Sequence, residues 1–586
     1  MERGLKTQHV TDRIFPFIAW LRTYKAAYLK DDAVAGLTVA VVLIPQSMAY
    51  AMLAGLPPVY GLYAGAITPM IGALWGSLRQ LATGPIAIMS LLVLTTLSPI
   101  AEPGSQKFIE LSFLLAFLVG SIYLLIGVFR LGLIMSFISH SAVKGFTSAA
   151  SLIIISTQLP HLFGIHIKHH EYIVWKLIAI AQGVPGLHWP TLGIGLLALG
   201  IIYGIKKISP NFPAALVALV VTTLLVYGLQ LNESGIAIVG QSQGGLPTPA
   251  LPPFNLDMLF DLTGPAVVLA LVSFAETYSV GKSISAETKQ KLDVDQEFIG
   301  QGVANLVGSF FQCYPVSGSF SRTAINFASK ARTGVSSAIT TFSVIIVLLF
   351  LTPLLTYIPK AALAALVINA VLMLFHPKEV FRLFKMNRHD GIVAICVFTL
   401  SLLAKPDYAL LIGILMSLVF FLWKTMHPRI VRIAKDPELN MFVNADICDK
   451  PGCPQILHLR SDNVIYFANA EYTIEHILER LDEIDTHAKF LLLDLQAMAF
   501  IDITGIDELR VLQEEVRERG MELALMEIRL PVKEVMKSSG FLTQINPEFM
   551  LQKRGDAITT LFKHIDHNYC KTICSHALFY ECNTVK

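Results

Sequence analysis

The sequence predicts a polytopic α-helical membrane protein with a smaller α/β domain after its last membrane segment. Of its 586 residues, 54% are hydrophobic and only 15% are charged, and the mean hydropathy is +0.59. Soluble domains carry about 25% charged residues, so this deficit indicates an integral membrane protein. Apolar segments dominate from Val34 to about Trp423, and the composition becomes that of a soluble domain after about Arg429. The net charge of +2 gives no reason to expect nucleic acid as a partner.

The apolar part divides into segments that are long enough to cross a bilayer. Their ranges are 34–53, 59–76, 112–130, 133–157, 191–208, 213–230, 264–283, 335–357, 359–376, 388–404 and 407–427. Weaker segments lie at 84–98, 297–312 and 320–330, which brings the expected total to about fourteen. The segments at 84–98 and 320–330 are short, and each follows a stretch with Gly and Pro.

Two short, Gly/Pro-interrupted segments in corresponding positions of two halves are typical of a transporter's binding site. Here one is the third segment of the chain, and the other is the third segment counted from Gly264. We therefore expect two repeats of about seven segments, and an odd number per repeat makes the second repeat inverted. Alignment of residues 36–46 with 266–276 places Gln46 opposite Glu276.

The loop charges predict the orientation of the chain in the membrane, and the change in composition predicts its domains. With this segment count, the loop lysines and arginines all fall on the side of the N-terminus, which the positive-inside rule makes cytoplasmic. The predicted domains are a cytoplasmic N-terminal region at 1–33, a transport domain at 34–428, an α/β domain at 429–567 and a cysteine-rich tail at 568–586. In the α/β domain we expect strands at 456–460, 464–467, 489–495 and 522–526, and helices at 470–484, 504–519 and 530–539.

The stretch from Tyr314 to Thr323 combines Pro315, Gly318, several hydroxyl side chains and Arg322 inside the apolar region. A charge within a membrane segment indicates a functional site. A helix that begins near Ser319 would present free backbone N–H groups and a positive dipole end next to the arginine. Together these groups predict an anion-binding site, whereas the alternative is a polar loop outside the membrane.

Several motifs of the apolar part stand out, namely Pro45-Gln46, the run 55–63, Thr83-Gly84-Pro85, the run 305–311 with Asn305 and Gly308, and Ser317-Gly-Ser-Phe-Ser-Arg-Thr323. Together they resemble the SulP (sulfate permease) family of anion transporters, which includes prestin and pendrin. Asp502-Ile-Thr-Gly505 resembles the signature loop of a STAS domain. The resemblance covers about residues 30 to 560 and is strongest to bacterial proton-coupled sulfate permeases. It implies core and gate domains built from the two inverted repeats, a cytoplasmic STAS domain and a homodimer.

The resemblance also implies an anion site between the facing half-helices of the third and tenth segments. Its substrate-binding residues would be Gln46, Ile86, Ala87, Phe320, Ser321 and Arg322, with Glu276 beside them. Arg322 would supply fixed positive charge, since a guanidinium stays protonated and matches oxyanion geometry. The amide of Gln46 could donate without adding charge, or could only bridge two helices. Phe320 could form a wall of the pocket or face lipid.

Glu276 distinguishes the candidate mechanisms. An unpaired carboxylate would repel an anion, but a buried carboxyl group can take up a proton, and this would couple anion binding to protons. Alternatively, Arg322 could neutralise Glu276 permanently, and anion binding would then not be coupled to protons. A sodium site is less favoured because no oxygen ligands cluster around Glu276.

In the STAS domain, Thr504 is a possible regulatory phosphosite, because a phosphate at a helix N-terminus is electrostatically favoured. The simpler interpretation is that Asp502 and Thr504 cap the helix. Cys448, Cys453, Cys570, Cys574 and Cys582 include no CxxC pair, so we expect free cytoplasmic thiols, no metal site and no cofactor.

These observations predict proton-coupled uptake of sulfate by alternating access, in a bacterial inner membrane with both termini cytoplasmic. Bicarbonate, chloride or dicarboxylate transport or exchange is the alternative within transport. The alternative from another class is an anion sensor that signals through the STAS domain, which could also dock a cytoplasmic protein. An enzyme is not expected, because the sequence shows no Walker A loop and no nucleophile–base pairing.

Overall fold

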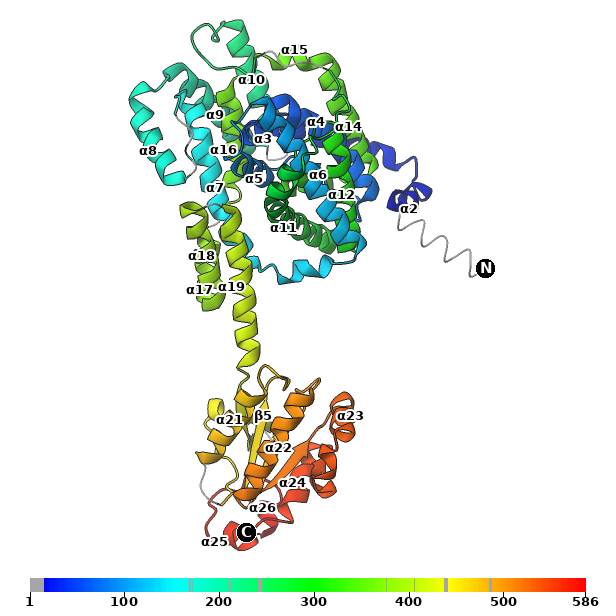
Figure 1. Cartoon of the computed structure of the whole chain (residues 1–586), viewed down its shortest axis with the longest axis vertical. Helices are drawn as coiled ribbons and strands as arrows, with labels where there is room; N and C mark the ends of the chain where they lie inside the picture. Colours follow the sequence, from blue (N-terminus) through cyan, green and yellow to red (C-terminus); the bar gives the residue numbers. More distant parts are fainter. Residues whose placement is uncertain are drawn as a thin grey trace. The chain divides into compact units, whose positions relative to one another are not determined.

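The computed structural model describes residues 15–167, 170, 172–209, 212–240, 245–375, 377–404, 406–436, 441–483 and 487–585 (Figure 1). The chain forms two compact units, residues 1–417 and 418–586. The first unit is helical, and the second contains a mixed β-sheet with helices. The division falls inside one long helix, Pro406–Met426.

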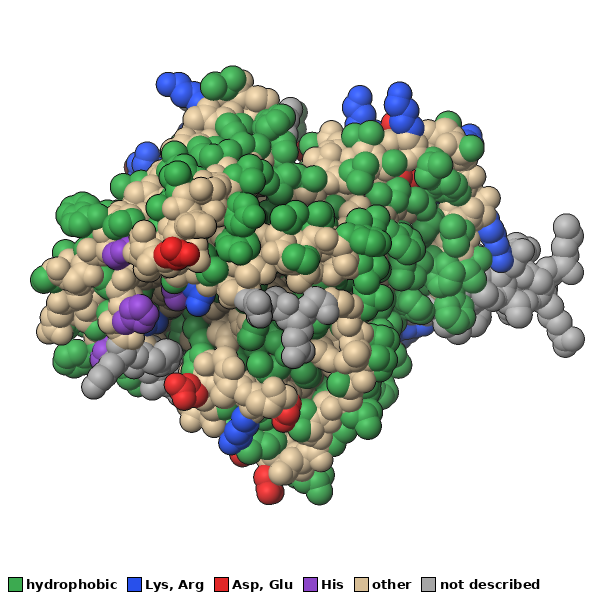
Figure 2. All heavy atoms as spheres, turned by 90° about the horizontal axis from the view of Figure 1, so that it is seen from above, with side chains coloured by type: hydrophobic (Ala, Val, Ile, Leu, Met, Phe, Trp, Pro, Cys, Tyr) green, Lys and Arg blue, Asp and Glu red, His purple; other side chains and the backbone are tan. Residues whose placement is uncertain are grey.

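Each of the predicted membrane segments corresponds to a helix. The helices up to residue 426 are α2 (Pro16–Arg22), α3 (Tyr28–Leu53), α4 (Pro58–Trp75), α5 (Ala87–Leu97), α6 (Gln106–Val128), α7 (His140–Phe163), α8 (Ile173–Gly183), α9 (Trp189–Ile208), α10 (Ala214–Gly228), α11 (Leu256–Thr288), α12 (Val294–Phe310), α13 (Phe320–Ala328), α14 (Val335–Ile346), α15 (Thr352–Leu355), α16 (Lys360–Leu372), α17 (Pro377–Met386), α18 (Arg388–Leu403) and α19 (Pro406–Met426). Among the described residues, eight helices are long and apolar enough to cross a membrane. Hydrophobic side chains cover much of the face drawn in Figure 2, and charged side chains are scattered on it.

The structure corrects some predicted boundaries. The segment expected at 133–157 begins as a 3-10 turn, Gly132–Phe137, and the α-helix begins only at His140. The reason is a cap, because the Ser139 hydroxyl accepts a hydrogen bond from the Ala142 N–H at 3.1 Å. Three shorter helices of this unit, α2, α8 and α17, were not predicted.

Close packing in the first unit depends on small residues. Helix α12 packs against α6 and α4, and α3 packs against α14 and α4. A Cβ atom added at Gly120 on α6 would lie 2.6 Å from the Leu306 backbone nitrogen. One added at Gly302 on α12 would lie 2.8 Å from the Leu124 nitrogen. Glycine therefore lets α6 and α12 approach closely, as small residues do between membrane helices.

The second unit has a six-stranded sheet in the order β4-β3-β5-β6-β7-β8, in which β5 to β8 are parallel and β3 is antiparallel to both of its neighbours. Its strands are β3 (Ile430–Asp436), β4 (Met441–Asn444), β5 (Ile456–Ser461), β6 (Phe490–Asp494), β7 (Glu522–Met526) and β8 (Met550–Leu551). Its helices after α19 are α20 (Ala445–Cys448), α21 (Ala470–Asp482), α22 (Ile503–Glu518), α23 (Leu530–Ser538), α24 (Arg554–Phe562), α25 (His567–Thr572) and α26 (Cys582–Val585). The prediction of a strand at 464–467 is wrong, since Ile465 forms only a single bridge, to Ile501.

Two apolar cores lie on the two faces of this sheet. Leu491 and Leu493 of β6 belong to one core, with residues of α21 and α22. Phe490 and Leu492 belong to the other, as the two-residue period of a strand requires. Phe579 and Cys582 are also buried in this second core. Much of the stretch that the sequence set apart as a tail, 568–586, therefore packs on the sheet.

Candidate anion-binding site

Two strands of two residues each bring distant parts of the membrane unit together. Strand β1 (Thr83–Gly84) pairs with β2 (Ser317–Gly318) in antiparallel register, with Thr83 opposite Gly318 and Gly84 opposite Ser317. The Ser319 N–H extends the pairing by donating to the Ala82 carbonyl at 2.9 Å. Helix α5 follows β1 and helix α13 follows β2, so the two helices begin at opposite ends of one short ladder.

Buried amides of α12 hold this ladder in place. The Asn305 side chain accepts from the Val316 N–H at 2.8 Å and donates to the Val316 carbonyl at 3.0 Å. The Gln301 amide donates to the Thr83 hydroxyl at 2.8 Å. The strands are too short for a sheet to pair all of their polar groups, and unpaired polar groups are costly inside a membrane. The amides of Asn305 and Gln301 supply hydrogen-bond partners instead.

Arg322 lies in the first turn of α13 and is completely buried. Its backbone N–H donates to the Ser319 hydroxyl, which caps the helix at 3.5 Å. Its Nη1 donates to Oε1 of Gln46 on α3, also at 3.5 Å. Nε and Nη2 have no hydrogen-bond partner among the described residues. A buried guanidinium with two unmet donor atoms is suited to an oxyanion, which can accept from both at once.

Glu276 on α11 is the acidic neighbour of this guanidinium. The titratable groups that act on Arg322 are Tyr50, Tyr314 and Glu276. The Oε2 atom of Glu276 is buried and has no hydrogen-bond partner in the described part of the chain. Neither unmet Arg322 nitrogen bonds to Glu276, so no direct ion pair joins the two side chains among the described residues.

A glycine makes room for the guanidinium. Gly84 has a φ of +153°, and a Cβ atom added there would lie 3.1 Å from Nη2 of Arg322. Any larger residue would press on the nitrogen that has no partner. The Gly84 predicted as a helix-breaking signal therefore also shapes the site.

The other predicted residues lie around the same ladder. Ile86 is the N-cap residue of α5 and Ala87 is its first residue, and both are buried. No side chain caps this end of α5. Phe320 begins α13 with 53% of its surface exposed, and Ser321 is half-buried beside it. The roles of these residues stay predictions.

Sequence reasoning missed a hydroxyl pair that links α5 to the stretch before β2. The Ser90 hydroxyl of α5 lies 3.3 Å from the hydroxyl of the fully buried Tyr314, which precedes β2. Ser90 is one turn into α5, and Tyr314 opens the polar stretch that drew attention to Arg322.

Comparison with known proteins gives the family. Residues 29–397 match the profile of the "Sulfate permease family", and residues 448–555 match that of the "STAS domain". The chain belongs to the sulfate permease family. It is 33% identical over 573 residues to "Sulfate transporter 4.1, chloroplastic" of Arabidopsis thaliana, which covers 94% of this chain and 83% of that protein. It is thus an integral membrane anion transporter with a C-terminal STAS domain.

Solved structures show the same fold. The overall structure of SLC26A9 superposes with a TM-score of 0.86 at 23% identity, covering 98% of this chain and 96% of that one. The transmembrane domain of the cyanobacterial bicarbonate transporter BicA superposes with a TM-score of 0.59 at 22% identity, covering 67% of this chain and 98% of that one. These likenesses confirm the predicted fold class, a polytopic helical transporter with an α/β STAS domain.

In the STAS domain, Asp502 caps α22 with one carboxylate oxygen, which accepts from the Gly505 N–H at 2.9 Å. Its other oxygen accepts from the Phe467 N–H at 2.8 Å. The Thr504 side chain is exposed in the first turn of the same helix. Asp502 therefore caps the helix as the sequence suggested, whereas Thr504, the other expected capping residue, is not the N-cap residue. The phosphorylation of Thr504 stays a prediction.

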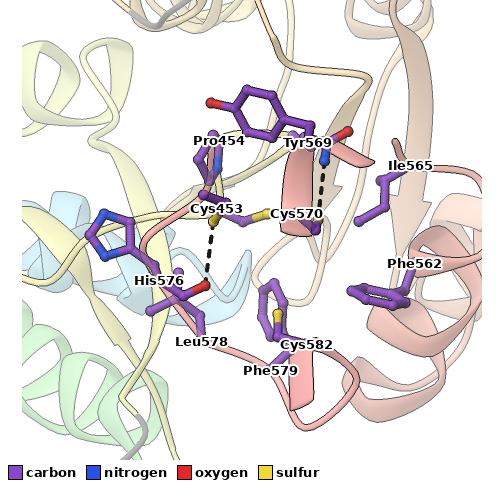
Figure 3. A pocket seen from close by; sticks show the side chains of 12 residues that line it. Cys453, Pro454, Phe562, Ile565, Tyr569, Cys570, His576, Leu578, Phe579 and Cys582 are labelled. Carbon is purple, nitrogen blue, oxygen red and sulfur yellow. Dashed lines mark hydrogen bonds between the residues drawn. The ribbon is translucent and has the colours of Figure 1, made fainter. Parts of the chain in front are cut away.

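Cys453, Cys570 and Cys582 line a cavity of about 10 Å³ beside the sheet (Figure 3). The Cys570 thiol accepts a hydrogen bond from the Gln455 amide at 3.3 Å. Burial raises the pKa of the Cys453 thiol to about 11, so the thiolate that binds metals is disfavoured at neutral pH. Among the described residues, no group of three or more His, Cys, Asp or Glu side chains is placed to hold a metal ion.

Proposed function

We propose that this sulfate permease takes up sulfate together with protons, with the anion held by Arg322 and the proton carried by Glu276. One observation carries the proposal. Two buried donor atoms of Arg322 and one buried acceptor atom of Glu276 have no partner among the described residues, although the two side chains are electrostatic neighbours. Unmet buried polar atoms cost about 1–3 kcal/mol each, more when charged, so a ligand and a proton that satisfy them would be held firmly. The names of the Arabidopsis relatives support sulfate as the anion.

The anion would bind where the two half-helices begin. Nε and Nη2 of Arg322 would donate to two sulfate oxygens, and backbone N–H groups at the start of α5 would face the others. The Gln46 amide already bonds Arg322 and would fix the guanidinium plane. The positive dipole ends of α5 and α13 would add to the attraction.

Glu276 would make this binding depend on protons. A carboxylate beside the site repels a dianion, whereas the protonated acid is neutral and can donate a hydrogen bond. Sulfate and a proton would therefore enter the site together and leave together. In the alternating-access cycle, exposure to the side with fewer protons would release the proton from Glu276, and the restored charge would expel the anion.

The test is Glu276→Gln in the full-length protein, reconstituted in vesicles. Glutamine resembles the protonated acid in shape and charge, so sulfate binding and sulfate–sulfate exchange should stay near wild type. Net uptake should lose its dependence on the pH gradient. Radiolabelled sulfate flux, with and without a gradient and with bicarbonate as competitor, measures both properties.

Glu297→Gln is the matched control. Glu297 is a second buried carboxyl group, but its oxygens accept hydrogen bonds from Ser77 at 2.9 and 3.0 Å and from Gln301 at 3.2 Å. This variant should lose thermal stability, and its sulfate uptake should still depend on the pH gradient. A folded Glu276→Gln protein with full proton-driven accumulation would refute the mechanism. Stronger inhibition by bicarbonate than by unlabelled sulfate would show that bicarbonate, and not sulfate, is the preferred anion.

A further inference from the structure

A cavity in the membrane unit lies beside the C-terminal half of α5, whereas the Arg322 site lies at its N-terminus. Its volume is about 30 Å³, and it lies between α5, α7, the beginning of α8 and the end of α18. A buried water needs about 10–15 Å³ by this measure, so the cavity has room for about two to three water-sized groups. Its polar lining consists of Thr95, Ser98, Thr157, His170, Lys176 and Ser401.

Lys176 supplies the charge. Its neighbours on α8, Val174, Trp175, Leu177 and Ile178, are exposed hydrophobic side chains, as expected for a helix in contact with lipid. Lys176 instead lines the cavity. Ionisable residues in membrane segments face the protein interior or a water-filled cavity, and they mark the paths of ions and substrates. Among the described residues that line the cavity, Lys176 carries a positive charge and none is acidic.

Ser401 gives an independent indication of a ligand. Only 1% of its surface is exposed, and its hydroxyl has no hydrogen-bond partner among the described residues. The hydroxyls of Thr95, Ser98 and Thr157 donate to backbone carbonyls of their own helices. Ser401 therefore has a free donor at a cavity that also contains a lysine. A hydroxyl donor and an ammonium group match an oxyanion and would not hold a cation.

The position of the cavity relates it to transport. Helix α5 begins at the Arg322 site, and its C-terminal half, from Leu91 to Ser98, lines this cavity. Its 11 residues span roughly 16 Å at 1.5 Å per residue. With the N-terminus cytoplasmic, as the loop charges predict, the C-terminal end of α5 faces the outside. The cavity and the Arg322 site thus lie toward opposite ends of one short helix.

We propose that this cavity is a second, outer anion-binding site, where Lys176 and Ser401 hold a small inorganic oxyanion before it reaches Arg322. The identity of that anion rests on the proposed function, and sulfate is the probe. The outer site raises the local concentration of anion at the entrance to the transport path. Its effect is therefore greatest when the external anion is scarce.

Binding stoichiometry tests the two sites separately. Equilibrium dialysis of radiolabelled sulfate against the full-length protein in nanodiscs should give two classes of site for wild type. Arg322→Gln should keep only the outer class, Lys176→Gln only the inner class, and the double variant neither. Lys107→Gln, which removes a lysine that donates to the Ile100 carbonyl and does not line the cavity, should keep both.

The outcomes separate this inference from the proposed function. If wild type shows a single class of sulfate-binding site and Arg322→Gln abolishes it, the outer site is overturned and the proposed function still stands. One class that disappears only in Lys176→Gln supports the outer site and refutes the role of Arg322. Loss of binding in Lys107→Gln would show a general effect of surface charge and overturn the outer site.

Uptake kinetics give a readout that a purely structural lysine would not change. In Lys176→Gln, the KM for external sulfate should rise several-fold while kcat stays near wild type. Lys176→Arg keeps the charge and should restore the KM, and Ser401→Ala should raise it by a smaller factor. A parallel fall in kcat, or an unchanged KM in a folded Lys176→Gln protein, would overturn the proposal.

Discussion

The two half-helices that meet at the β1–β2 ladder are built differently. Helix α5 begins at Ala87 with Ile86 as its N-cap residue, and it has neither a side-chain cap nor a charge in its first turn. Helix α13 begins at Phe320 with Ser319 as a side-chain cap and Arg322 in its first turn. Both follow strands of two residues that pair with each other. The backbone arrangement is shared, and the polar side chains are concentrated on one half.

This difference shows how charge is distributed in the site. Each helix N-terminus contributes about half a positive charge through its dipole, and the guanidinium contributes a full one. Arg322 therefore supplies about as much positive charge as both half-helices together. If α5 contributes only its backbone N–H groups and its shape, substitutions at α13 should have larger effects on anion binding than those at α5.

The largest effect is expected for Arg322→Ala. The remaining dipoles should hold sulfate about 100-fold more weakly, which corresponds to about 3 kcal/mol. Binding and vesicle uptake of radiolabelled sulfate measure the loss. Arg332→Ala is the control, because Arg332 is exposed and pairs with Asp31 at 3.1 Å, outside the site. Undiminished uptake by Arg322→Ala would show that the half-helices alone bind the anion.

Gly84→Ala should have the next largest effect, and it tests the α5 half. The new Cβ atom would lie 3.1 Å from Nη2 of Arg322, at a φ of +153° that side chains rarely adopt. Strain of this kind costs about 1–3 kcal/mol, so sulfate affinity should fall about tenfold. Gly104→Ala is a matched control, since its φ is +80° and no atom lies within 4 Å of the added Cβ. Equal losses of affinity in both variants would mean that general backbone strain, not pressure on Arg322, is responsible.

Much of this site could be predicted because its signals are local. Pro85 and Pro315 interrupt apolar runs, and a charged residue inside the second run indicates function without any structure. The pairing of Ser90 with Tyr314 could not be predicted in the same way. These residues are 224 positions apart in the chain, and the segments that carry them meet at the β1–β2 ladder.

Two parts of the fold escaped prediction for different physical reasons. Helix α8 has only 11 residues, too few to span a bilayer, so a search for membrane segments passes over it. The stretch 464–467 alternates like a strand, but after the bridge at Ile465 the chain turns to begin α21. The Asn469 side chain stabilises this turn, because it accepts from the Tyr466 N–H at 2.9 Å. Helix length explains the first miss, and a side-chain hydrogen bond within the turn explains the second.

The smallest effect is expected for Ser319→Ala, which makes the start of α13 resemble that of α5. An N-cap serine contributes about 0.5–2 kcal/mol to its helix, and the 3.5 Å bond to the Arg322 N–H is long, so the low end of this range applies. Sulfate affinity should then fall only about twofold, because the guanidinium keeps its charge. Ser139→Ala removes the cap of α7 and should lower thermal stability without changing the affinity. If Ser319→Ala lost as much affinity as Arg322→Ala, the position of the first turn would matter more than its charge. The two half-helices would then bind the anion in the same way, through backbone N–H groups, and Arg322 would serve mainly to hold α13 in place.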